Sequence, residues 1–179
     1  ATMGCTVGMC SLSMDTVAHM PCNPAVGGTA KGHVVREIDA MGGLMGKAID
    51  ATGLQFKLLN RSRGPAVWSP RAQADKRAYA EWVRETLRRY PNIEWLVGAV
   101  ARVCVEGGRT AGVEFEDGRR CSCAAIVVTT GTFLGGLIHI GPVRRRSGRF
   151  GEAPSDTLAA SLRALGFTMG RLKTGTPPR

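Results

Sequence analysis

Residues 100–132 read VARVCVEGGRTAGVEFEDGRRCSCAAIVVTTGT, and this stretch decides the fold. It contains three short strand-like segments separated by two glycine-containing turns, namely Val100–Val105, Thr110–Phe115 and Arg119–Cys123, with turns at Gly107-Gly108 and Asp117-Gly118. Such turns are typical of hairpins, so the three segments predict a β-meander. The meander leads into Ala125–Thr130, a continuous apolar run that predicts a parallel strand buried on both faces.

Helical patterns and further strands flank this stretch. Short apolar strands are predicted at Cys5–Leu12 and Ile93–Val97, and a helix from about His33 to Met41. A second helix is predicted from Pro70 to about Arg89, capped by Ser69, with a buried stripe of Ala74, Ala78, Trp82, Leu87 and Tyr90. A third starts near Ser155 and is expected to bury Leu158, Leu162 and Leu165. Helices that alternate with buried strands predict an α/β fold, here a Rossmann-like FAD-binding domain with a parallel sheet and an inserted β-meander.

Composition indicates a globular chain with a strongly basic surface. Of the 179 residues, 44% are hydrophobic and 21% charged, which excludes a disordered chain. Neither a signal peptide nor an apolar run of membrane-spanning length is present, so we expect a cytoplasmic protein without a membrane partner. The net charge of +10 favours a polyanionic partner such as RNA, although a solubility role is also compatible with it. The six cysteines match neither a disulfide scaffold nor a zinc site, and no metal is expected.

Three short motifs are candidates for cofactor contacts. The loop Gly27–Gly32 is neither a G-x-G-x-x-G nor a Walker A motif. Its glycines before a helix could bring backbone N–H groups to an anion or a flavin, or could serve only a tight turn. Thr130-Gly131 ends the expected core strand, where doubly wound sheets bind ligands. Ser155 at a helix start is either a plain cap or a cap that also meets a phosphate or flavin edge.

Two further features suggest chemistry or RNA contact. Cys22 precedes a helix N-terminus, with Lys31 and His33 nearby in sequence, a setting that can favour a thiolate. An inert loop cysteine is the alternative. The run Arg144-Arg145-Arg146 is either a solvated charge cluster or a contact for RNA phosphates.

Taken together, many stretches of this chain resemble the N-terminal flavin domain of the MnmG/GidA family. The similarity runs in collinear order over nearly the whole chain. The stretches that carry it are Cys22–Gly28, Lys31–His33, Glu37–Gly43, Gln55–Asn60, Gly64–Val67, Arg71–Asp75, Thr130–Leu134, Ile138–Gly141 and Gly170–Arg179.

The resemblance implies an activity that sequence patterns alone do not indicate. It implies FAD-dependent installation of the aminomethyl or carboxymethylaminomethyl group on carbon 5 of the tRNA wobble uridine. NADH and methylenetetrahydrofolate are the implied co-substrates, and the GTPase MnmE is the implied partner. The full-length protein is expected to be a homodimer within a heterotetramer.

The resemblance also implies individual site residues. Val100 matches a position whose backbone meets the adenine of FAD, Ser155 matches another FAD contact, and Thr130 and Gly131 are expected close to the dinucleotide. The loop with Asn23, Gly27 and Gly28 is expected beside the flavin. Cys22 matches a family cysteine near the flavin, while a second family cysteine falls beyond residue 179. RNA contacts are expected from Lys31, Arg144, Arg145, Arg146 and Lys173.

For domain organisation, residues 1–179 are expected to form a partial FAD-binding domain. The family's first strand and its phosphate loop would precede Ala1, and the substrate and NADH domain is expected to start from about residue 141. Two alternatives remain open. One is the folate- and FAD-dependent tRNA uridine-54 methyltransferase, which has a different cysteine loop, and the other is a non-catalytic basic RNA-binding module.

Overall fold

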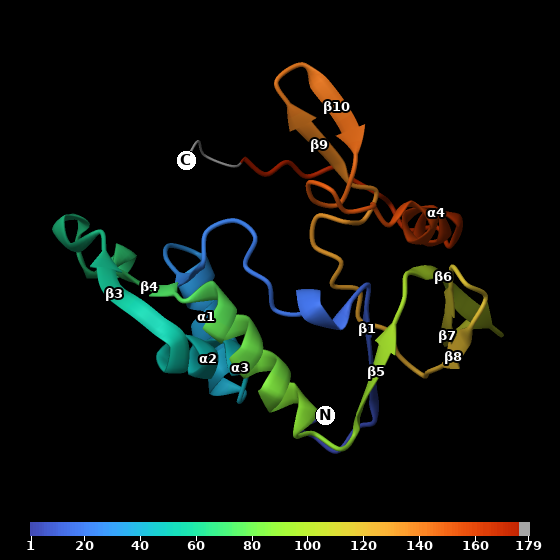
Figure 1. The fold of residues 1–179 in the computed structure, drawn as a ribbon, viewed down its shortest axis with the longest axis horizontal. Coiled ribbons are helices and arrows are strands. Elements are labelled where there is room, and N and C mark those ends of the chain that lie inside the picture. Colours follow the sequence, from blue (N-terminus) through green and yellow to red (C-terminus); the bar gives the residue numbers. More distant parts are fainter. Residues whose placement is uncertain (176–179) are drawn as a thin grey trace. The chain divides into compact units, whose positions relative to one another are not determined.

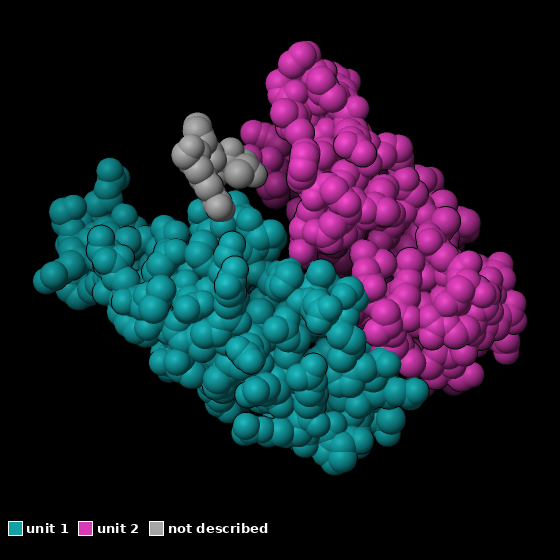
Figure 2. All heavy atoms as spheres, viewed as in Figure 1, with its two compact units in different colours: residues 1–9, 13–95 teal, residues 10–12, 96–179 magenta. Residues whose placement is uncertain are grey.

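The computed structural model describes residues 1–175, which divide into two compact units (Figure 2). Unit one comprises residues 1–9 and 13–95, and unit two comprises residues 10–12 and the chain from residue 96 onward. The strands β1 (Val7–Ser11) and β5 (Ile93–Val97) pair in a two-stranded parallel sheet, as their sequences predict. Each of these two strands runs from one unit into the other.

Unit one is built on a three-stranded antiparallel sheet with helices on one face (Figure 1). The strand order is β2-β4-β3. Its strands are β2 (Ala25–Gly27), β3 (Gly53–Leu59) and β4 (Ser69–Ala74), and its helices are α1 (Lys31–Ala40), α2 (Leu44–Thr52) and α3 (Lys76–Arg88). Short 3-10 turns lie at Met14–Thr16, Arg61–Arg63 and Pro65–Val67. The core contains Val26, Ala48, Ile49, Ala72, Ala74 and Tyr79.

The predicted helix from Pro70 to Arg89 is wrong over its first six residues. Residues 69–74 form β4 instead, because Ala72 and Ala74 alternate with the more exposed Arg71 and Gln73, which is the period of a strand. The helix begins at Lys76, and Asp75 rather than Ser69 caps it. The Asp75 carboxylate accepts hydrogen bonds from the N–H groups of Arg77 (2.9 Å) and Ala78 (3.1 Å).

The later start of α3 also changes which of its residues face the core. Tyr79 and Ala80 are its buried residues. Of the predicted stripe, Ala74 is buried in β4 and Trp82 packs against the core, whereas Ala78, Leu87 and Tyr90 are partly buried. The elements α2 and β3 were not predicted from the sequence at all.

Unit two contains the predicted β-meander and one helix packed on it. Its strands β6 (Val100–Glu106), β7 (Arg109–Phe115) and β8 (Arg120–Ser122) pair in that order, and all pairs are antiparallel. The helix α4 (Asp156–Ala164) packs against β6, and the Val103 N–H donates to Ser161 Oγ (3.2 Å). Leu158 is buried as expected, whereas Leu165 is exposed. A hairpin that was not predicted, β9 (Leu137–Ile140) with β10 (Val143–Arg146), lies between the meander and α4 in sequence.

The predicted buried strand Ala125–Thr130 is not a strand within the described part of the chain. No strand among residues 1–175 pairs with it, and the Val127 side chain is 85% exposed. A strand requires a neighbour for its backbone hydrogen bonds, and apolar composition cannot supply one. The α/β class with an inserted meander is nevertheless confirmed. None of the helices within residues 1–175 has both the length and the apolar character needed to cross a membrane.

Candidate cofactor and RNA-binding sites

The loop between β2 and α1 is held in a strained turn. The Lys31 N–H donates to the Thr29 carbonyl (2.9 Å), and Ala30 between them has φ 66° and ψ −58°. This is a γ-turn with positive φ, a rare conformation for a residue with a side chain. Strained backbone of this kind clusters at functional sites, so this loop is a candidate for such a site. The helix α1 therefore starts at Lys31, two residues earlier than predicted.

Gly27 and Gly28 have structural reasons to be glycine. Both have positive φ (95° and 91°), and a Cβ at Gly27 would collide with the Pro70 carbonyl oxygen of β4. The Gly28 N–H donates to the same oxygen (2.8 Å). The tight-turn role is thus present in the structure. The cofactor contact of these glycines stays a prediction, and the Gly28 N–H is already engaged.

A polar network missed by the sequence analysis supports this turn. Asn60, in the left-handed conformation, donates from Nδ2 to Thr29 Oγ1 (3.1 Å) and to the Val67 carbonyl (3.1 Å). Thr29 Oγ1 lies 3.3 Å from Ser69 Oγ, and the Ser69 residue is only 2% exposed. These contacts join the turn to the end of β3 and the start of β4. The sequence pattern predicts Ser69 as a helix cap, whereas the structure places it at the start of β4, where it joins this network.

The remaining predicted residues of unit one lie around the same loop. Cys22 and Asn23 are exposed, and the Asn23 carbonyl accepts a hydrogen bond from the Ala25 N–H (2.7 Å). The Lys31 ammonium donates to the Ala25 carbonyl (3.0 Å), so part of its hydrogen-bonding capacity is used within the protein. Its RNA contact and the role of Cys22 stay predictions.

In unit two, Thr130, Gly131 and Ser155 are brought to one loop system. The Phe133 N–H donates to the Thr130 carbonyl (3.0 Å), and the Ser155 N–H donates to the Phe133 carbonyl (2.8 Å). Gly131 has φ 55°. Val100 starts β6, the strand on which α4 packs. Four predicted FAD positions therefore belong to unit two, whereas Asn23, Gly27 and Gly28 belong to unit one.

Ser155 differs from its prediction in one respect. It occupies the N-cap position of α4, but its side chain makes no capping hydrogen bond. The predicted role of the hydroxyl as a cap is therefore wrong. The negative charge that suits this helix end comes from Asp156 in the first turn.

The three arginines of the cluster on β10 differ in their contacts. Arg146 Nε donates to Asp156 Oδ2 (2.8 Å), and Nη2 lies 2.5 Å from Oδ1 without hydrogen-bond geometry. The Arg146 guanidinium lowers the pKa of the Asp156 carboxyl, opposed by partial burial. Arg144 and Arg145 are exposed and form no ion pair within residues 1–175. Arg146 therefore ties the hairpin to α4, and the RNA contact of Arg144 and Arg145 stays a prediction. Lys173 is exposed, and its RNA contact stays a prediction.

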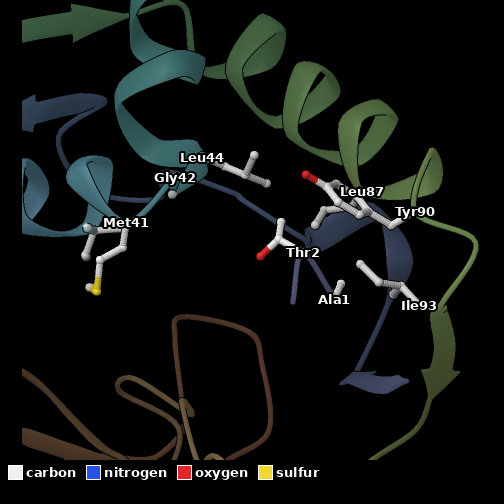
Figure 3. Close-up of a pocket in the computed structure, with 10 residues that line it drawn as sticks. Ala1, Thr2, Met41, Gly42, Leu44, Leu87, Tyr90 and Ile93 are labelled. Atoms are coloured by element: carbon white, nitrogen blue, oxygen red, sulfur yellow. The ribbon is translucent and has the colours of Figure 1, made fainter. Parts of the chain in front are cut away.

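An apolar cavity of about 320 Å³ in unit one contains none of the predicted site residues (Figure 3). Ile38, Met41, Leu44 and Leu87 supply much of its wall, together with Tyr90 and Ile93. No charged side chain lines it, so it does not resemble a site for an anionic cofactor.

Comparison with known proteins identifies relatives over the whole chain. The family model described as glucose inhibited division protein A (GIDA) matches residues 1–179. The chain is 50% identical over 179 residues to the tRNA uridine 5-carboxymethylaminomethyl modification enzyme MnmG of Protochlamydia amoebophila, and likewise 50% to that of Syntrophotalea carbinolica. Each comparison covers 100% of this chain and 29% of the relative, so the chain spans less than a third of the length of these relatives.

Solved structures agree with the sequence relatives. The structure of Aquifex aeolicus GidA matches 98% of this chain and 29% of its own length, with a TM-score of 0.90 and 48% identity. The GidA-related protein from Thermus thermophilus shares the fold at 20% identity and a TM-score of 0.60. The Rossmann-like FAD-domain architecture predicted from the sequence is thereby confirmed. With a family match over every residue and a close structural match, this chain belongs to the GIDA (MnmG/GidA) family.

Proposed function

We propose that this chain is the FAD-binding part of an enzyme that installs an aminomethyl or carboxymethylaminomethyl group on carbon 5 of the tRNA wobble uridine. The observation that carries the proposal is 50% identity, over the entire chain, to relatives named as tRNA uridine 5-carboxymethylaminomethyl modification enzymes. NADH and methylenetetrahydrofolate are the proposed co-substrates, and the GTPase MnmE is the proposed partner. We further propose a cytoplasmic homodimer within a heterotetramer.

The residues present are compatible with a dinucleotide cofactor. Thr130, Gly131 and Ser155 belong to one hydrogen-bonded loop system beside the start of α4, and the Ser155 hydroxyl is not used as a cap. Backbone N–H groups at a helix start can receive a phosphate or a flavin edge, so this loop system suits a contact with FAD. Val100 would meet the adenine, and Asn23 with Gly27 and Gly28 would lie beside the flavin. FAD would supply the hydride chemistry, and the protein would bind and orient it.

The proposal is tested with the full-length form, meaning a protein of the relatives' length that carries this chain. Purified full-length protein should show flavin absorbance, and with its co-substrates and MnmE it should convert wobble uridine to the modified base, read by nucleoside mass spectrometry. Absence of both flavin and product would contradict the proposal. RNA binding without flavin would instead support the non-catalytic module.

Replacing Ser155 by Ala is expected to weaken FAD binding and leave stability nearly unchanged. Because the side chain makes no capping hydrogen bond, the free energy of unfolding should change by less than about 0.5 kcal/mol. A lost hydrogen bond to FAD should lower FAD affinity about tenfold. Flavin fluorescence titration and thermal unfolding of the full-length form measure the two quantities. A destabilised variant with full FAD affinity would restore the cap interpretation.

Cys22→Ser is expected to slow uridine modification without abolishing it. Cys22 is exposed in the loop that leads into the strained turn, which suits a residue that shapes the flavin site. A second family cysteine is expected beyond residue 179, so we assign the pocket role to Cys22 and expect a loss of about ten- to a hundredfold, with FAD still bound. Single-turnover assays with the full-length form measure the rate. Complete loss of product, together with loss of a trapped covalent RNA adduct, would make Cys22 the nucleophile.

A further inference from the structure

The hairpin formed by β3 and β4 carries positive charge only. Residues 53–74, which comprise both strands and their connection, contain no carboxylate and four cations, namely Lys57, Arg61, Arg63 and Arg71. None of these cations forms an ion pair within the part of the chain that the structure describes. The strand register places Lys57 directly opposite Arg71, and like charges opposite each other destabilise a sheet. The charge of the hairpin therefore suits an anionic partner.

The connection between β3 and β4 is a loop held by its own hydrogen bonds. Asn60 begins it in the left-handed conformation (φ 60°), and its Nδ2 donates to the Val67 carbonyl near the other end (3.1 Å). The Arg63 N–H donates to the Asn60 carbonyl (2.9 Å), and the Trp68 N–H donates to the Pro65 carbonyl (3.2 Å). Because these bonds hold the loop in one conformation, a partner can bind it without the entropic cost of ordering it.

Trp68 is an exposed aromatic residue fixed at the end of this loop. Its indole Nε1 donates to the Arg61 carbonyl (3.2 Å), and 42% of the residue is exposed. Since the indole N–H is engaged, the surface that the ring can offer to a partner is apolar. The same bond places the indole beside the turn Arg61–Arg63, and both arginines of that turn are exposed. Exposed aromatic rings beside cations are the features with which proteins hold unstacked nucleobases and the adjoining phosphates.

The loop also lies beside the turn that precedes α1. Asn60 Nδ2 donates to Thr29 Oγ1 (3.1 Å), and Ser69 Oγ lies 3.3 Å from the same oxygen. Because α2 leads directly into β3 and α3 follows closely after β4, the connection lies at the end of the hairpin away from those two helices (Figure 1). A partner on this loop would therefore be held close to Gly27 and Gly28, which are proposed to lie beside the flavin.

We propose that the connection between β3 and β4 binds an unstacked stretch of the substrate RNA, with one base stacked on Trp68 and neighbouring phosphates against Arg61 and Arg63. This inference rests on the proposed function and names the surface of unit one that holds the RNA. An enzyme that acts on an RNA base needs the surrounding loop unstacked, and an aromatic ring flanked by cations holds a base in that state. An acidic protein segment is the competing partner, and it would require the arginines but not the indole ring.

The phosphate contacts are tested with Arg61→Gln and Arg63→Gln in the full-length form. The probe is an RNA stem-loop with uridines in its loop, and affinity is measured by fluorescence anisotropy at several salt concentrations. Each variant should weaken binding about three- to tenfold and lower the salt slope by about 0.7, the loss of one phosphate contact to a single strand. Lys47→Gln removes the same charge from an exposed position of α2, outside the hairpin, and it should change affinity less than about twofold.

The base contact is tested with Trp68→Ala and Trp68→Phe. Both variants lose the hydrogen bond to the Arg61 carbonyl, but only Trp68→Ala loses the aromatic ring. Trp68→Ala should weaken RNA binding about tenfold at an unchanged salt slope, and Trp68→Phe should retain most of the affinity. RNA that carries 4-thiouridine in its loop should photocrosslink to residues 60–68. Equal losses of affinity in the two variants would mean that Trp68 only holds the loop, and the stacking contact would be wrong.

The remaining outcomes separate this surface from the proposed function. If the Arg61, Arg63 and Trp68→Ala variants all behave like Lys47→Gln, or if crosslinks map outside residues 60–68, the RNA surface is wrong while RNA modification stands. If the arginine variants lose affinity for a polyglutamate peptide and not for RNA, the partner is an acidic protein segment and the proposal is overturned. If the parent protein binds no RNA, the proposed function fails as well.

Discussion

Gly27→Ala is expected to destabilise unit one by roughly 2 to 5 kcal/mol. Gly27 has φ 95°, and an added Cβ would overlap the carbonyl oxygen of Pro70 in the central strand β4. Positive φ alone costs an alanine about 1 to 2 kcal/mol, and overpacking against the backbone adds roughly 1 to 3 kcal/mol. Because domains are stable by only about 5 to 15 kcal/mol, this is a large fraction of the total.

Gly28→Ala is the matched control for the backbone collision. Gly28 has nearly the same φ, 91°, but no atom lies within 4 Å of an added Cβ. It should therefore show only the conformational penalty of about 1 to 2 kcal/mol. Hydrogen exchange of the full-length form, followed at the amides of β3 and β4, measures the local free energy of opening for both variants. Equal losses of stability in the two variants would show that the Gly27 backbone does not lie against the Pro70 carbonyl oxygen.

The double change Arg144→Ala with Arg145→Ala is expected to weaken tRNA binding about ten- to a hundredfold at low salt. Both guanidinium groups are exposed on β10 and have no ion-pair partner among residues 1–175, so each is available for a phosphate. Each lost phosphate contact should lower the slope of log affinity against log salt by roughly 0.7 to 0.9. Filter binding or anisotropy with the full-length form over a range of salt concentrations measures both quantities.

Arg146→Ala is the contrasting variant on the same strand. Its guanidinium is engaged by Asp156 at the first turn of α4, so its loss should loosen the hairpin and change the salt slope little. An equal fall in slope for Arg146→Ala and for the double variant would mean that the Asp156 contact gives way to RNA. An unchanged slope in the double variant would return Arg144 and Arg145 to a solvated surface role.

The candidate site was predictable from the sequence only in part. The arginine run on β10 and the glycine-rich loop before α1 can be recognised in the sequence, because charge and glycine content are local properties. The sequence does not show which of these arginines forms an ion pair, since the pairing of Arg146 depends on Asp156, which lies ten residues further along the chain. The opposition of Lys57 and Arg71 is not visible in the sequence either, because the two become neighbours only through the pairing of β3 with β4.

What the sequence alone determined is the α/β class, the β-meander of unit two and the family resemblance, because hairpin turns and short-range alternation are local properties. The tertiary structure decided the rest. Residues 69–74 contain nothing that prevents helix formation at Pro70, yet pairing with β2 and β3 makes them a strand. Ala125–Thr130 has the composition of a buried strand but no pairing neighbour in the described chain. A strand exists only when another strand accepts its backbone hydrogen bonds, and that partner is a non-local fact that no local pattern contains.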